Sequence, residues 1–102
     1  MNRKYLGDYH HYLIEKLGSD VNESRLYLNT ALEESDPEDF LVALRNVVEA
    51  HGITKTARLA GLNRVSLYKM LSKRGNPSIF SLAAILKALG FEFRIERSHR
   101  AA

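Results

Sequence analysis

Residues 53–71 read ITKTARLAGLNRVSLYKML, and this segment predicts two short helices joined by a tight turn. Two helices that cross steeply need a small residue where they touch, and Ala57 meets that need. Gly61 supplies a residue that tolerates positive φ in the turn. The apolar positions expected on the inner side of the second helix are Leu62, Leu67 and Met70.

The same register predicts which side chains of the second helix point outward. They are Arg64, Val65, Tyr68 and Lys69, with Ser66 at the margin. An α-helix fits the DNA major groove, where Arg or Lys can bond guanine acceptors and an apolar group can contact the thymine methyl. The segment therefore predicts DNA binding, although Val65 and Tyr68 could instead pack against the protein.

Helical periodicity and capping residues predict four further helices outside this segment. The expected helices are 8–17 with a stop at Gly18, one that runs to about Glu34 after a cap at Asp20 or Asn22, 37–51 ending at Gly52, and 79–89 after a cap at Ser78. Thr54 and Asn63 are the expected N-caps of the two short helices. The expected fold class is all-α, in one domain over residues 1–102 with a helical extension (1–36) and a core (37–90).

Residues 91–97 have a different pattern, because Phe91, Phe93 and Ile95 alternate with charged residues. A period of two predicts a short β-strand. One strand needs a partner for its backbone groups, and no second strand is evident in the chain. We therefore expect these three apolar residues to contact a second copy, as in a homodimer, or another protein.

The net charge of +3 conceals an uneven distribution of charged residues along the chain. Residues 1–49 contain five Lys or Arg and ten Asp or Glu, whereas residues 50–91 contain seven Lys or Arg and no carboxylate. A region of a single sign attracts a polyanion and steers its approach. The distribution predicts that the second half of the chain meets phosphate.

Composition excludes several classes of protein. Apolar residues make up 45% and charged residues 26% of the 102 residues, which is typical of a globular domain. Without cysteine there is no disulfide or thiolate zinc site, and no segment resembles a signal peptide or a membrane helix. We expect a cytoplasmic protein that is not an enzyme and uses no cofactor or metal, because no catalytic constellation is evident and His10, His11, His51 and His99 lack ligand spacing. The tyrosines Tyr5, Tyr9 and Tyr12 are expected to pack in the core, with contact to a partner protein as the alternative.

Residues 53–71 resemble the helix-turn-helix of the lambda-repressor and Cro family, the xenobiotic-response-element type. The resemblance rests on Ala57, Gly61, Leu62, Leu67 and Met70, followed by Gly75, Pro77 and the helix that ends at Gly90. It implies a lambda-repressor-like bundle with extra N-terminal helices. The implied base contacts are Arg64, Val65, Ser66, Tyr68 and Lys69. The implied phosphate contacts are Thr54 and Lys55 at a helix start, with Asn63, Lys73, Arg74 and Asn76.

A second resemblance covers most of the chain. The segments YLNTALEESDP (27–37), FLVALR (40–45), GITK (52–55), LYK (67–69) and GNP (75–77) are similar to the probable addiction-module antidote family. It implies an antitoxin of the HigA-like type, which neutralises a RelE-like ribonuclease toxin and represses its own operon at an inverted repeat. Two alternatives are a phage-type regulator without a toxin and a toxin-binding module with little DNA affinity.

Overall fold

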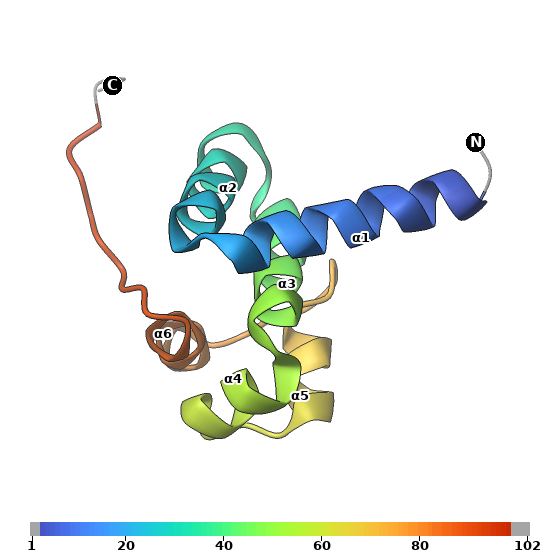
Figure 1. Ribbon diagram of the computed structural model, residues 1–102. Coiled ribbons are helices and arrows are strands. Elements are labelled where there is room, and N and C mark those ends of the chain that lie inside the picture. The colour runs from blue at the N-terminus through green and yellow to red at the C-terminus, as the bar shows by residue number, and fades with distance from the viewer. Residues whose placement is uncertain (1–2, 99–102) are drawn as a thin grey trace.

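The computed structural model describes residues 3–98, and the side chains of residues 7–98. This part of the chain contains six α-helices and no β-strand, so the all-α expectation is confirmed (Figure 1). The helices are α1 (Arg3–Ser19), α2 (Val21–Glu34), α3 (Pro37–His51), α4 (Ile53–Ala60), α5 (Arg64–Met70) and α6 (Ile79–Ala88).

Helix α3 lies at the centre of the molecule. It packs against α1 and α2 on one side and continues into α4, which packs against α5 and α6 (Figure 1). Its inner residues Leu44, Val47 and Val48 are completely buried. Apolar residues of α1, α2, α5 and α6 complete the same cluster, so α3 connects the N-terminal helices to the α4–α6 end.

Most of the predicted helix caps are present. The Asp20 carboxylate accepts a hydrogen bond from the backbone N–H of Asn22 at 2.9 Å, and Ser78 Oγ accepts one from the N–H of Ser81 at 3.0 Å. Pro37 is the first residue of α3, where its missing N–H costs nothing. These residues begin α2, α6 and α3 at the positions that the sequence predicts.

The prediction of Thr54 as an N-cap is wrong. Helix α4 begins at Ile53, directly after Gly52, which has φ +104°. The carbonyl oxygen of Gly52 accepts the first helical hydrogen bond, from the N–H of Thr56 at 3.0 Å. One glycine therefore separates α3 from α4, and Thr54 lies inside the first turn.

Helix α1 departs from its prediction in three ways. It begins at Arg3, five residues before the predicted start at Asp8. It also continues through Gly18 to Ser19. Gly18 lies where α1 meets α3, and a β-carbon there would lie 3.2 Å from the carbonyl oxygen of Ala50, so the glycine permits this close contact instead of ending the helix. Tyr9 and Tyr12 are each 60% exposed rather than packed in the core. The first half of α1 projects beyond α3, so it has no core to bury them (Figure 1). The side chain of Tyr5 lies outside the described residues.

The predicted C-terminal strand is absent. Residues 91–98 run as an irregular segment after α6, because no other strand among residues 3–98 offers them backbone partners. Phe91 is half-buried against the core and its N–H donates to the carbonyl of Leu86 at 2.7 Å, whereas Ile95 is 98% exposed. None of the described helices combines the length and the apolar character needed to cross a membrane.

Candidate nucleic-acid interface

A three-residue turn joins α4 to α5. Gly61 has φ +70°, a left-handed conformation that glycine adopts without strain. The N–H of Leu62 then donates to the carbonyl of Ala57 at 2.9 Å, and Ala57 itself is buried. The two short helices and the turn that the sequence predicts are therefore present.

Helix α5 is anchored by its inner side. Leu67 is completely buried and Leu71, just after the helix, is 1% exposed. Leu62 and Met70 are half-buried and pack against the same core, so all three predicted inner residues face the protein. This anchoring fixes which side of α5 faces outward.

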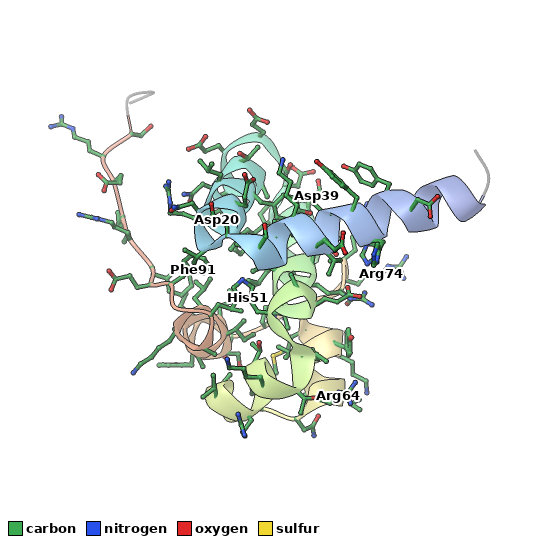
Figure 2. The ribbon with its side chains drawn as sticks, in the orientation of Figure 1. Asp20, Asp39, His51, Arg64, Arg74 and Phe91 are labelled. Atoms are coloured by element: carbon green, nitrogen blue, oxygen red, sulfur yellow. The ribbon has the colours of Figure 1, made fainter. Side chains whose placement is uncertain are left out.

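The outward side of α5 presents Arg64, Val65 and Lys69. All three are exposed, and Val65 keeps 64% of its surface accessible although it is apolar. Among residues 7–98 no ion pair engages Arg64 or Lys69. Ser66 is half-buried at the edge of this side. Arg64 lies at the end of the molecule farthest from α1 and α2 (Figure 2).

Tyr68 is placed differently from the other predicted base contacts. It is half-buried, and the guanidinium carbon of Arg45 lies over its ring at 5.0 Å from the centroid. This is a cation–π contact between α3 and α5. Sequence analysis missed Arg45, because the contact joins two residues far apart in the chain and Arg45 belongs to the acid-rich half.

The predicted phosphate contacts are spread around this end of the molecule. Thr54 and Lys55 are exposed in the first turn of α4. Arg58 is exposed in the last turn of the same helix, and it was not among the predicted contacts despite its place in the acid-free region. Asn63 is exposed, but its side chain is already engaged, because it accepts a hydrogen bond from the N–H of Ser66 at 2.8 Å.

The loop between α5 and α6 carries the remaining predicted phosphate contacts. Lys73 lines a pocket between α2 and α3 together with the carboxylate-bearing Asp39. Arg74 is exposed and lies on the α1 side of the loop, away from Arg64 (Figure 2), and Asn76 is exposed. Lys73 and Arg74 therefore do not share one outward side with Arg64.

Acidic side chains gather at one end of the molecule, although Lys73 of the acid-free region lines the same pocket as Asp39. Five exposed carboxylates surround the α2–α3 turn, namely Glu33, Glu34, Asp36, Glu38 and Asp39. Helices α4, α5 and α6 contain none. Asp39 and Arg64 accordingly lie toward opposite ends of the molecule (Figure 2).

Exposed apolar side chains also lie outside α5, among them those on α6 and on the segment after it. On α6, Ile79 is 61% and Phe80 84% exposed, and Ala83 on the same side is exposed as well. Phe93 is 49% exposed on the segment after α6, and this segment and α2 line a shallow groove. Sequence analysis missed the α6 surface, since Ile79 and Phe80 look like ordinary core residues in an apolar helix.

The histidines form short contacts on the other helices. His10 Nε2 lies 3.4 Å from Glu49 Oε2, His11 Nε2 lies 3.4 Å from Glu15 Oε1, and His51 Nε2 lies 3.4 Å from the buried Ser24 Oγ. Within the described part of the chain, no three His, Asp or Glu side chains converge as a metal site would require. His99 lies outside the described residues.

Comparison with known proteins identifies a family. The family described as probable addiction module antidote protein matches residues 10–97. An uncharacterized protein of Haemophilus influenzae is 40% identical over 76 residues, which cover 74% of this chain and 78% of that protein. No solved structure matches the chain. The family match runs from the middle of α1 through α6 into the C-terminal segment, and the chain therefore belongs to the probable addiction module antidote family.

Proposed function

We propose that this protein is the antitoxin of a toxin–antitoxin module and that it represses transcription by binding DNA through α4 and α5. The observation that carries the DNA-binding part is the outward side of α5. Arg64, Val65 and Lys69 are exposed there, beside helices that contain no carboxylate. A helix with free cations and an apolar group suits the edges of bases in the major groove.

In the proposed complex α4 and α5 act as a helix-turn-helix of the lambda-repressor and Cro type. Helix α5 enters the major groove, where Arg64 and Lys69 bond base acceptors and Val65 contacts thymine methyl groups. Thr54 and Lys55 contact a phosphate at the start of α4, where backbone N–H groups and the helix dipole favour an anion. The exposure of all these side chains supports the proposal.

The protein is proposed to act as a homodimer on an inverted repeat, because a single seven-residue helix reads only a short half-site. We propose that the α6 surface of Ile79, Phe80 and Ala83 forms the contact between copies. A two-fold contact sets the same surface against itself and would bury these apolar side chains, with the exposed Lys87 one turn after Ala83 on the same side of α6. The segment that contains Phe93 and Ile95 then remains available to another protein.

The partner is proposed to be a toxin, as the description of the family implies. A RelE-like ribonuclease toxin and a HigA-like type of antitoxin follow from the resemblance of the sequence. The five exposed carboxylates around the α2–α3 turn would suit a basic toxin. Neither repression nor toxin capture needs catalysis, and we propose a cytoplasmic protein without enzymatic activity.

The DNA-binding part is tested by gel-shift titration with a duplex from the region upstream of the protein's own gene. We expect tighter binding to this duplex than to a shuffled duplex of equal length, and a steep loss of affinity with salt. Equal affinity for both duplexes would instead favour a toxin-binding module with little DNA specificity.

The toxin part is tested separately by co-expression with the neighbouring gene product and purification through a tag on this protein. We expect the two proteins to purify as a stable complex. We also expect co-expression of this protein to relieve the growth arrest that the neighbouring gene product causes when it is expressed alone. Sequence-specific DNA binding without any complex would favour a phage-type regulator.

A further inference from the structure

We propose that Arg45 of α3 contacts the DNA backbone beside α5, and that the ring of Tyr68 holds its guanidinium in position. This inference rests on the proposed DNA binding. It adds to the contact surface a residue from outside the segment 53–71, and it gives Tyr68 a role other than reading bases.

The first step is the geometry of the contact. The guanidinium carbon of Arg45 lies 5.0 Å from the centre of the Tyr68 ring, inside the range of about 6 Å in which cation–π attraction is effective. Tyr68 is half-buried on a helix whose inner side is fixed by Leu67. Its ring is therefore held in place by the packing of α5. An exposed arginine on a helix surface ordinarily samples several rotamers, and the contact with this ring restricts those of Arg45.

The second step is that the donors of Arg45 remain available. A guanidinium stacks through its face, and its five N–H donors lie in the plane and point outward from the edges. Among residues 7–98, no hydrogen bond or ion pair engages this guanidinium. The carboxylate one turn along α3, that of Glu49, lies instead against His10, with its Oε2 3.4 Å from His10 Nε2.

The third step is the place of the contact. Tyr68 lies three and four residues after Val65 and Arg64, and residues at these spacings are neighbours on a helix surface. Arg45 therefore borders the outward side of α5. Phosphates line both edges of a groove that admits a helix, and a planar fork of donors suits their oxygens. The chemistry of Arg45 at this border fits a DNA phosphate.

The experiment compares Arg45→Gln with Arg25→Gln, since Arg25 is an exposed arginine on α2 outside the α4–α5 surface. Binding to the upstream duplex and to a shuffled duplex is measured by fluorescence anisotropy between 50 and roughly 200 mM salt, the range in which phosphate contacts dominate affinity. We expect Arg45→Gln to weaken binding to both duplexes about tenfold and to lower the salt slope by about one. Arg25→Gln should leave both quantities unchanged.

Two substitutions at Tyr68 distinguish its role in holding the Arg45 guanidinium from a role in contacting bases. Tyr68→Phe keeps the ring and should keep the affinity, whereas Tyr68→Leu removes the ring and should weaken both duplexes in the same way. Combining Tyr68→Leu with Arg45→Gln should cost less than the sum of the single losses, because the two residues act as one unit. Arg45→Lys keeps the charge and should restore the salt slope while recovering only part of the affinity.

The results distinguish the failure of this inference from the failure of the proposed function. If the unaltered protein binds neither duplex, the proposed DNA binding and the role of Arg45 are both overturned. If it binds but Arg45→Gln behaves like Arg25→Gln, only the role of Arg45 is overturned. A loss confined to the upstream duplex would also overturn it, because a phosphate contact weakens all sequences alike.

Discussion

The side-chain oxygen of Asn63 accepts a hydrogen bond from the backbone N–H of Ser66 at 2.8 Å. This bond begins α5 one residue before Arg64, the first side chain of its outward side. The cap therefore sets both the start of the helix and the direction in which Arg64 leaves it. Asn63 was predicted both as the N-cap of this helix and as a phosphate contact, and the structure confirms the cap.

Substituting Asn63 should separate these two tasks. Asn63→Ala should lower the free energy of unfolding by about 1 kcal/mol, because it removes the cap. Asn63→Asp keeps an acceptor at the cap and should retain stability, while its charge repels phosphate and lowers DNA affinity. Urea denaturation and gel-shift titration check the two effects. Equal stability of the Ala variant and the unaltered protein would contradict the structural role.

Arg64 and Lys55 should differ in their effect on sequence preference. Arg64→Ala should cost about 1–3 kcal/mol in binding the upstream duplex and relax the preference at one base pair, because it removes a base contact. Lys55→Ala should weaken all duplexes alike. Anisotropy titration of single-base variants of the duplex measures both. If Arg64→Ala changes neither affinity nor preference, α5 does not enter the groove as proposed.

Gly75 should tolerate no side chain. A β-carbon at this position would overlap the carbonyl oxygen of Met70 and displace the loop that follows α5. We expect Gly75→Ala to destabilise the protein by about 1–3 kcal/mol, the range of overpacking. Gly7→Ala is the matched control, since nothing lies within 4 Å of its added methyl in α1, and it should raise stability slightly. Thermal unfolding that ranks the two variants in the opposite order would contradict this packing.

The α6 surface should hold two copies together. Phe80→Glu replaces the exposed aromatic side chain of α6 by a carboxylate and should convert dimers to monomers, because it removes the largest apolar side chain of the contact and the contact would desolvate the new charge. Ile95→Glu, on the segment after α6, should leave the dimer intact. Sedimentation at several protein concentrations measures both. If Ile95→Glu alone produces monomers, the copies meet through the C-terminal segment instead.

Local sequence signals predicted much of the fold. Asp20, Pro37, Asn63 and Ser78 mark helix starts that the structure confirms, because caps act within a few residues and depend little on the rest of the chain. The inner positions of α5 followed from the helical period. These local signals were enough to predict that the fold is all-helical.

The errors arose where distant contacts outweigh local preference. Gly18 reads as a helix stop, but the packing of α1 on α3 carries the helix past it. The alternation of residues 91–97 reads as a strand, yet a strand exists only beside another strand. Arg45 gave no local signal, because its contact with Tyr68 is a product of the tertiary fold.

The separation of carboxylates around the α2–α3 turn from the cations of α4–α6 gives the molecule a permanent electric dipole. In the field of a duplex such a dipole experiences a torque that rotates α5 forward and the acidic end backward before any contact forms. The orientation of encounters then becomes non-random at low ionic strength. At about 1 M salt, where the screening length falls to about 3 Å, this alignment vanishes.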